Sequence, residues 1–486
     1  MNPPQLHCRQ CGTTYPLTVL TKTCSRCNSV LFVSYDYDNV AKKLGNSKNE
    51  SGLSGLWKYS DLLPPSGGPT ISLGEGGTFL QRSNRLASAC GVRTLYLKNE
   101  TTNPTGSFID RGVALEVSGA AALHVREFQC APTGNLGASL AAYAARAGIG
   151  CKLYISPDIN PGKLLQMIAC DAQIKLGSIE PSEGAGCLWV SPADPYILEG
   201  EKTIAFEIRE QLRSTSTSRI IVPMGTGGLI TMLWKGVKEL TTLGLAEEDE
   251  FQLVGTQATG CAPIVDAFEK GLSTVRRVPN MQTLAIDLKV ALPPLGDTAL
   301  DALRSSHGSA LAVSDDEILE ATRLLAKTEG IFAEPVSAST VAALKKMVQS
   351  KDIDPQEEVV CVITGAGLKD PSATSRLLER RRKVRFLVKR REERVEPAAI
   401  GETKTMILRL LDKGETYGYE IWKQLAKRGI KVKIPSVYQH LSELEVLELV
   451  ERSKTLVIAG KPERHCYLLT AKGRETLALL ERFRPL

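Results

Sequence analysis

Apolar and polar positions along residues 37–375 follow two alternating periods, and this pattern predicts an α/β domain. Short runs of β-branched residues indicate strands, longer alanine-rich runs indicate helices, and glycine-rich turns follow several of the strands. Such an alternation is typical of a mainly parallel sheet, in which ligands bind at the carboxyl ends of the strands. The runs that support this prediction are 93–100, 107–120, 124–132, 135–149, 151–157, 162–172, 218–228 and 357–367.

The last 90 or so residues show a different pattern. Three helical periods, at 403–414, 417–429 and 435–450, precede two strands that flank a glycine and proline turn, and a final helix is expected to begin near Thr470. Helices followed by a hairpin predict a winged helix-turn-helix. The domain boundaries expected from these changes are 1–36 for a cysteine-containing ribbon, 37–375 for the α/β domain, 376–399 for a basic connector and 400–486 for the winged helix.

The N-terminal segment contains two CxxC pairs separated by twelve residues. Two turns that each present a pair of thiolates can close a tetrahedral zinc site, and a site with four protein ligands is normally structural. We therefore predict that Zn is bound by Cys8, Cys11, Cys24 and Cys27. The other eight cysteines are scattered singly, which favours a reducing compartment over a disulfide framework.

Length and charge narrow the class of protein. A chain of 486 residues with 43% apolar composition predicts two to four domains, and it contains neither an apolar run long enough for a membrane span nor the layout of a signal peptide, so a cytoplasmic protein is expected. Residues 376–486 carry a net charge of +11, which leaves about −5 for residues 1–375. This basic end favours a nucleic-acid partner, the alternative being a solvated charged face.

Residues 103–110 predict a helix start that presents position 109. Ser107 and Asp110 have the spacing of a capping box, so a helix is expected to begin at or near Ser107 with Ile109 in its first turn. The crowded turn formed by residues 103–106 indicates that backbone passes close to another group there.

Three turns after predicted strands are candidates for ligand contact. Gly225, Thr226, Gly227 and Gly228 lie between a strand and a helix, where converging backbone N–H groups can hold an anion. Asn135 can donate a hydrogen bond to a ring oxygen, and the Thr364 hydroxyl can face a ring nitrogen. Each signal is weak alone, because a tight structural turn explains it equally well.

The order of these segments resembles threonine synthase, a pyridoxal-phosphate enzyme with the tryptophan synthase β-subunit fold. The resemblance covers about residues 1–375 and includes an N-terminal zinc ribbon similar to that of some members. It implies that the cofactor phosphate is held by Gly225–Leu229, the ring hydroxyl oxygen by Asn135 and the pyridine nitrogen by Thr364. The segments that carry it are 74–80, 97–112, 132–139, 194–208, 223–230, 293–297, 329–339 and 364–370.

The chain departs from this pattern at Ile109, where the family has the lysine that forms a Schiff base with the cofactor aldehyde. Lysine is needed both as the nucleophile and as the base that moves substrate protons, and isoleucine can do neither. Substitution by Lys98, on an expected strand, or by Lys369 is not favoured. We therefore predict no catalytic residue at this position, while the phosphate and ring contacts remain able to bind pyridoxal phosphate noncovalently.

The C-terminal segment resembles the PadR-like winged-helix regulators through residues 417–425, 434–452 and 464–477. Val437, Leu441 and Leu444 form the expected inward stripe of a recognition helix. The residues expected to face bases or phosphates are Lys431, Lys433, Ser436, Tyr438, Gln439 and His440, and the wing adds Lys461 and Arg464. Recognition helices need two half-sites for useful affinity, so a homodimer is expected. The alternative to DNA binding is a winged helix that contacts another protein.

The sequence thus predicts a DNA-binding transcription regulator whose inactive threonine synthase-like domain senses pyridoxal phosphate, an amino acid or an adduct of the two. One alternative is an active lyase, with its lysine supplied elsewhere or with Ile109 introduced deliberately. Another is a scaffold that keeps the fold for dimerisation and binds no ligand.

Overall fold

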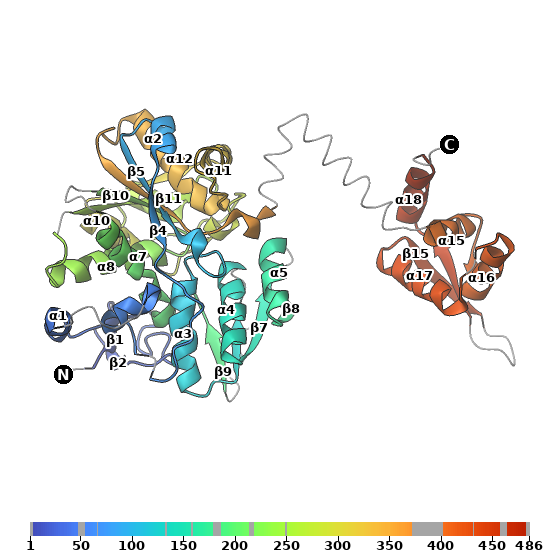
Figure 1. The fold of residues 1–486 in the computed structure, drawn as a ribbon, viewed down its shortest axis with the longest axis horizontal. Coiled ribbons are helices and arrows are strands. Elements are labelled where there is room, and N and C mark those ends of the chain that lie inside the picture. Colours follow the sequence, from blue (N-terminus) through green and yellow to red (C-terminus); the bar gives the residue numbers. More distant parts are fainter. Residues whose placement is uncertain are drawn as a thin grey trace. The chain divides into compact units, whose positions relative to one another are not determined.

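The computed structural model describes residues 3–46, 54–65, 67–131, 134–156, 159–177, 186–212, 218–247, 250–371, 402–430, 432–456 and 464–482. The chain divides into two compact units, Met1–Leu377 and Leu378–Leu486, which are described separately (Figure 1).

The largest sheet of the first unit has six strands in the order β12-β11-β10-β13-β5-β4. All neighbours in this sheet pair in parallel except β4, which is antiparallel to β5. A mainly parallel sheet was predicted from the sequence, and this topology confirms it. The strands are β4 (Phe79–Arg82), β5 (Thr94–Asn99), β10 (Ser218–Pro223), β11 (Phe251–Ala258), β12 (Ser309–Val313) and β13 (Glu358–Ile363).

A second, four-stranded sheet has the order β8-β7-β6-β9 and is wholly parallel. Its central strands β6 and β7 alternate with α4 and α5, and α4 packs against both α5 and α3 (Figure 1). The strands are β6 (Glu127–Cys130), β7 (Gly150–Ile155), β8 (Gln173–Leu176) and β9 (Cys187–Val190).

Helices cover both sheets and bury an apolar core around each of them, as parallel strands require. The α-helices are α1 (Tyr37–Asn46), α2 (Asn84–Cys90), α3 (Asp110–Ala122), α4 (Gly134–Ala147), α5 (Pro161–Ala169), α6 (Pro195–Glu201), α7 (Thr203–Gln211), α8 (Gly228–Thr242), α9 (Pro263–Glu269), α10 (Gly296–Ser305), α11 (Asp315–Glu329) and α12 (Pro335–Ser350). Single turns of 3-10 helix occur at η2 (Glu100–Thr102), η3 (Ile286–Leu288) and η4 (Gly367–Lys369), with a longer one at η1 (Gly55–Leu62).

The N-terminal residues form a small antiparallel sheet of β1 (Gln5–Cys8), β2 (Thr14–Pro16) and β3 (Leu31–Ser34). This ribbon is attached to the α/β domain through side chains that follow or belong to β3. Phe32 packs with Leu198 and Met232, and the Tyr35 hydroxyl donates to Glu199 at 2.8 Å. The ribbon therefore shares part of its core with α6 and α8.

The second unit contains three helices, a small antiparallel sheet and a final helix, as the sequence pattern predicted. Val437, Leu441 and Leu444 are fully buried in one apolar cluster, which confirms the predicted inward stripe. The elements are α15 (Glu402–Asp412), β14 (Thr416–Tyr417), α16 (Gly418–Lys427), α17 (Ile434–Val446), β15 (Val450–Leu456), β16 (Arg464–Leu469) and α18 (Ala471–Arg482).

The predicted capping box at Ser107 is wrong. Helix α3 begins at Asp110, and Ile109 occupies the N-cap position rather than the first turn. The backbone of Ser107 is instead paired with Gly365, while the Asp110 carboxylate accepts hydrogen bonds from the Thr105 N–H at 2.7 Å and the Thr105 hydroxyl at 2.6 Å. Tertiary pairing therefore occupies the residue that the local pattern assigned to the cap. A true capping box forms elsewhere, between Ser314 and Glu317.

The crowded turn before α3, residues 103–106, contacts another loop of the protein and does not line the cavity. Gly106 has a φ of +76°, and a Cβ there would lie 3.1 Å from the Ala366 Cβ. The Ala366 N–H donates to the Gly106 carbonyl at 2.9 Å. The close approach expected from the sequence is thus made to the loop that follows β13.

None of the described helices is both long enough and apolar enough to span a membrane.

Candidate functional site

A cavity of about 400 Å³ lies at the carboxyl ends of strands from both sheets of the first unit. Its walls come from the segments that follow β10 and β13 in the large sheet and β6 and β7 in the small sheet. This is the position at which ligands bind in open parallel α/β sheets. All seven residues predicted to contact a cofactor, together with Ile109, line it.

The glycine loop 225–228 forms one end of the cavity and leads into α8. Gly227 is the N-cap residue with a φ of +84°, and a Cβ there would lie 2.6 Å from the Leu295 carbonyl oxygen. A Cβ on Gly225 would lie 2.5 Å from the Asp287 carbonyl oxygen. Glycine is therefore required for the loop to pack, and this packing leaves backbone N–H groups at the start of a fifteen-residue helix, where an anion is stabilised.

Ile109 presents an apolar side chain to the same cavity. It is 5% exposed and belongs to the apolar cluster around α3 and α4. The neighbouring Phe108 N–H donates to the Thr364 carbonyl at 3.0 Å, which fixes Ile109 beside the end of β13. The side chain contains no group that can act as a nucleophile or a base.

Thr364 is buried, lines the cavity and shares a hydrogen bond of 2.9 Å with the Ser337 hydroxyl. The Ser337 hydroxyl also accepts a hydrogen bond from the Gly365 N–H at 2.8 Å. These contacts hold the Thr364 hydroxyl in place at the cavity wall, as its predicted contact with a ring nitrogen requires.

Asn135 lines the cavity, but its amide is oriented by protein groups. Nδ2 donates to Asp287 at 2.8 Å and to Glu334 at 3.0 Å, so both of its N–H bonds are occupied. The Oδ1 atom is buried and accepts no hydrogen bond within the described part of the chain. In this arrangement Asn135 offers an acceptor to the cavity, whereas a donor to a ring oxygen was predicted.

Lys163, in α5, is a cavity residue that the sequence analysis did not identify. Its Nζ lies 2.6 Å from Asp287 and 3.6 Å from Glu334, and its side chain is 3% exposed. Although burial lowers its pKa, the attraction of Asp287 and Glu334 outweighs burial and raises it overall. The Lys163 ammonium is therefore stabilised in its charged form, which is not a nucleophile.

The two lysines considered earlier as substitutes are placed elsewhere. Lys98 donates to the Thr78 carbonyl at 2.8 Å and to Glu207 at 2.6 Å, and Lys369 donates to the Thr105 carbonyl at 2.8 Å. Neither lysine is among the residues that line the cavity. Both are buried and engaged by other groups.

Glu201, the last residue of α6, is a second cavity residue that the sequence analysis missed. Its Oε2 atom is buried, has no hydrogen-bond partner among the described residues, and would lie 3.4 Å from a Cβ on Gly228. Burial raises the pKa of Glu201 well above its usual value. Burial therefore favours the neutral form of this carboxyl group, which lies beside the glycine loop and in that form can donate one hydrogen bond to an anion.

The cavity residues fit pyridoxal phosphate bound without a covalent bond. The glycine loop offers N–H groups to a phosphate, Thr364 offers a fixed hydroxyl to a ring, and the volume is within the range usual for small-molecule pockets. Ile109 has no amine with which the cofactor aldehyde could form a covalent bond.

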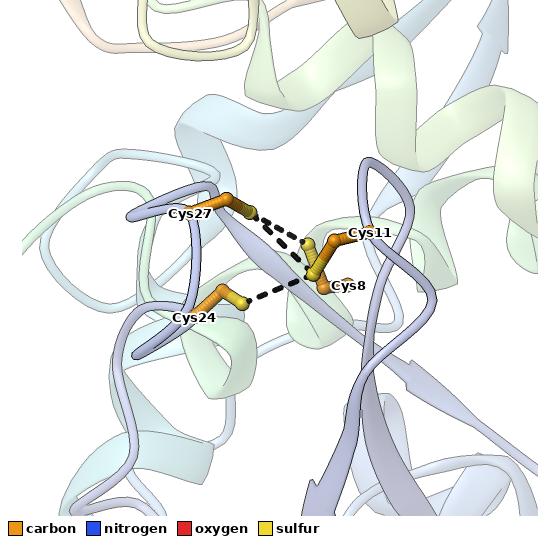
Figure 2. Close-up of side chains that lie close together, drawn as sticks. All are labelled: Cys8, Cys11, Cys24 and Cys27. Atoms are coloured by element: carbon orange, nitrogen blue, oxygen red, sulfur yellow. Dashed lines mark hydrogen bonds between the residues drawn. The ribbon is translucent and has the colours of Figure 1, made fainter.

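The four N-terminal cysteines come together in the ribbon, as predicted. Their sulfur atoms all lie within 4.8 Å of one another, on the two turns that carry the CxxC pairs (Figure 2). The Tyr15 hydroxyl lies 3.1 Å from the Cys24 sulfur and lowers the pKa of that thiol to about 6, whereas burial raises the pKa of Cys8 to about 11. The cluster could hold a metal ion, and a set of four thiolates suits Zn.

The predicted DNA-contacting residues of α17 are partly committed to other contacts. Gln439 Nε2 donates to Glu443 at 3.0 Å, and His440 Nδ1 lies 3.3 Å from Glu443. Tyr438 is 37% exposed, and its ring lies so close to Gly418 that a Cβ there would be 2.5 Å from it.

The other predicted positions of the second unit differ in how far they are described. Lys433, at the N-cap of α17, is exposed, and Ser436 is half-buried in the first turn. Lys431 and Lys461 lie outside the described residues, and only the backbone of Arg464 is described, at the start of β16.

Comparison with known proteins identifies both units. Residues 71–365 match the family of pyridoxal-phosphate dependent enzymes, and residues 407–479 match the transcriptional regulator PadR-like family. The threonine synthase of Methanocaldococcus jannaschii is 41% identical over 385 residues, covering 76% of this chain and 94% of that protein. The threonine synthase of Methanosarcina acetivorans is 38% identical over 377 residues, covering 75% and 92%.

Solved structures show the same fold. Maize serine racemase has a TM-score of 0.53 at 20% identity, over 62% of this chain and 92% of that chain. Threonine deaminase isoform 2 from Solanum lycopersicum has a TM-score of 0.53 at 21% identity, over 62% and 82%. From the family match and the threonine synthase relatives together, the chain belongs to the pyridoxal-phosphate dependent enzyme family and joins a threonine synthase-like domain to a PadR-like regulator domain.

Proposed function

We propose that this protein is a DNA-binding transcription regulator whose threonine synthase-like domain binds a small ligand without converting it. The observation that carries the proposal is Ile109, an apolar side chain in a cavity that also presents polar groups of Asn135, Thr364 and the glycine loop. The cavity ligand proposed from the family is pyridoxal phosphate, an amino acid or an adduct of the two. When bound, pyridoxal phosphate supplies an aldehyde that captures amines and a ring that withdraws electrons.

The chain's own residues support binding rather than turnover. The N–H groups of the glycine loop and the Glu201 carboxyl group are available to an anion, and Thr364 positions a hydroxyl. Lys163 is held as an ammonium by Asp287 and Glu334, so it offers no free base. Proton transfer by a positioned base is commonly worth about 10² to 10⁴ in rate, and this chain provides no such base at Ile109.

The PadR-like domain supports DNA as the partner. Recognition helices of winged modules act in pairs on two half-sites, so we expect a homodimer, and ligand binding would act by changing the spacing or orientation of the two modules. Because its target is DNA, the protein is expected to act in the cytoplasm. Zn in the cysteine ribbon is proposed as a structural ion.

A footprint titration tests the sensing function. The full chain is bound to genomic fragments, and the operator that it selects is then titrated with pyridoxal phosphate, with an amino acid mixture and with both together. A change of at least threefold in operator affinity is expected with one of these additions. The Ile109→Trp variant, in which a larger side chain fills the cavity, is expected to bind the operator without this change. An operator affinity that no addition alters would remove the sensing function.

A surviving enzyme is the rival function. Incubation with pyridoxal phosphate, borohydride reduction and peptide mass analysis distinguish the two functions, because a lyase that uses another lysine would carry a pyridoxyl group on it. The proposal expects no stoichiometric label on Lys98, Lys163 or Lys369. Threonine formation from phosphorylated homoserine by the purified chain would overturn it.

A further inference from the structure

The wall of the cavity near Asn135 carries two carboxylates that are ion-paired to the same lysine. Asp287 and Glu334 both accept hydrogen bonds from Asn135, and a single ammonium, that of Lys163, serves both carboxylates. Just outside the cavity lining, Lys369 attracts both Glu334 and Asp110. Lys289 belongs to the lining but is exposed, and within the described residues it forms no ion pair with Asp287 or Glu334. The two carboxylates thus share one ion-paired cation, Lys163.

Two buried acceptor atoms in this wall, Asn135 Oδ1 and Glu334 Oε1, accept no hydrogen bond within the described residues. Lys163 Nζ lies 3.6 Å from Glu334 Oε1, which is an ion-pair distance without a hydrogen bond. Glu334 is 2% exposed, and its burial, together with the neighbouring Asp287 charge, raises its pKa even though Lys163 acts in the opposite direction. A buried acceptor without a donor is destabilising, so a ligand that supplied N–H groups and a positive charge would be stabilised by both atoms.

The opposite end of the cavity has the complementary character. The glycine loop and the N-terminus of α8 supply backbone donors and a partial positive charge. The buried, unpartnered Glu201 Oε2 lies beside the same loop, and the neutral carboxyl group that burial favours adds a donor there. The cavity therefore has an end suited to an anion and a wall suited to a cation, and Ile109 contributes neither charge.

We propose that the pocket selects a phosphate monoester that also carries a primary ammonium group, the amine form of the cofactor in preference to its aldehyde form. The phosphate binds at the glycine loop, and the ammonium donates to Glu334 and Asn135 Oδ1 beside Ile109. No bond is formed or broken. This inference rests on the proposed function, since it names the ligand of the same pocket.

Three ligands that differ at one substituent test the proposal by calorimetry on the full chain. Pyridoxamine phosphate carries the ammonium, pyridoxine phosphate carries a hydroxyl in its place, and pyridoxal phosphate carries the aldehyde. We expect the amine to bind at least tenfold more tightly than the hydroxyl and aldehyde forms. Equal affinity for the three, tighter binding of the aldehyde or hydroxyl form, or no binding of the amine would overturn the proposal.

Two charge-neutral substitutions assign the preference to the acidic wall. Glu334→Gln and Asp287→Asn keep the size of each side chain and remove its charge, and each is expected to reduce the amine preference to below threefold. Glu320→Gln, on an exposed carboxylate paired with Lys345 away from the cavity, is the matched control and should keep the full preference. Thermal melts confirm that each variant is folded. Full preference in both cavity variants would overturn the assignment.

The outcome is separable from that of the proposed function. Calorimetry reports ligand selection alone, whereas the operator footprint reports the effect of the ligand on DNA binding. Tight, amine-selective binding with unchanged operator affinity would refute regulation and leave the ligand assignment intact. An operator response to the aldehyde form together with weak binding of the amine would refute the ligand assignment and leave regulation intact.

Discussion

Ile109 presents a branched hydrocarbon to a cavity that also holds polar groups of the glycine loop, Thr364 and Glu334. Replacing it with lysine would place an amine within the same cavity as Glu334 and the glycine loop. We predict that Ile109→Lys forms a covalent adduct with pyridoxal phosphate, because the substitution supplies a nucleophile to a cavity that the glycine loop and Thr364 still line. Borohydride reduction followed by peptide mass analysis should place a pyridoxyl group on residue 109.

The parent chain and Ile109→Met serve as controls for this experiment and should remain unlabelled. Methionine matches the length of lysine without its nitrogen, so labelling of the methionine variant would show that another amine in the cavity had reacted. Failure of Ile109→Lys to react, in a protein that still melts cooperatively, would show that the cavity no longer accepts the cofactor.

Glu201 predicts a pH dependence of stability. Burial raises its pKa in the folded state above the value of about 4.5 expected when unfolded. A carboxyl group of this kind contributes fully to stability below the unfolded pKa, and its contribution is lost as the pH rises through the folded pKa. Glu201→Gln cannot ionise, so it should melt above the parent protein by a margin that widens from pH 5 to pH 8.

Thermal melts at several pH values check this prediction, with a margin of about 1–3 °C expected at pH 8 for a domain of this size. Glu210→Gln, at an exposed carboxylate of α7, is the control and should show a margin that stays constant with pH. A Glu201→Gln margin that narrows as the pH rises would contradict the assigned direction of the pKa shift.

At the scale of elements, α3 is fixed to its surroundings by a buried ion network. The Arg111 guanidinium contacts Glu100 at 2.7 Å and Glu207 at 2.7 Å, and Lys98 contacts the same Glu207 at 2.6 Å. These contacts lower the pKa of Glu207, although burial acts in the opposite direction. The network joins the start of α3, directly after Ile109, to η2, β5 and α7.

Glu207→Gln is expected to lower the free energy of unfolding of the first unit by about 3–5 kcal/mol, because it leaves two buried cations with too few anions. Chemical denaturation measures the change. The parent protein should lose stability as the pH falls below about 4.5 toward the folded pKa of Glu207, whereas the variant has no such loss from this residue. A change below about 1 kcal/mol would show that the network is dispensable.

The four-cysteine cluster predicts that the ribbon binds one zinc ion. Cys24→Ser should reduce bound zinc from one equivalent to well below half, as measured by elemental analysis, because one of four ligands is lost. Cys261→Ser, at a cysteine outside the cluster, is the control and should retain the metal. A parent protein purified without zinc, and unable to take it up, would contradict the prediction.

The sequence predicted some of these elements more completely than others, and the reason is physical. The CxxC pairs, the glycine loop and the inward stripe of α17 are local patterns whose chemistry depends on short spacing. No such pattern marks the cavity residues Lys163, Glu201 and Asp287. They are far apart in the chain and come to line one cavity only when the protein folds. Ser107 shows the opposite case, in which a clear local signal was overridden by pairing with Gly365.

Strands β11 and β12 illustrate the same limit for the fold. Residues 309–313 of β12 form a short strand that is mostly half-buried at the edge of the sheet, so its apolar pattern is brief. Strand β11 is almost fully buried, and a buried strand shows no alternation of apolar and polar positions. The sequence pattern therefore predicted the fold class but not the number of strands in the sheet.

At the scale of the whole molecule, the basic second unit predicts a salt dependence of DNA binding. Lys433 is exposed at the N-cap of α17, where a phosphate contact is expected. Each phosphate contact releases counterions, so Lys433→Ala should reduce the slope of log affinity against log salt by about 1 per recognition helix, or about 2 for a dimer on two half-sites. Binding to unrelated DNA should weaken in parallel, because phosphates carry no sequence information.

The matched control is Lys270→Ala, at an exposed lysine of the first unit, and it should leave the slope unchanged. A slope that Lys433→Ala does not alter would remove this residue from the interface, and a reduction of 1 rather than 2 would indicate that a single copy binds each site.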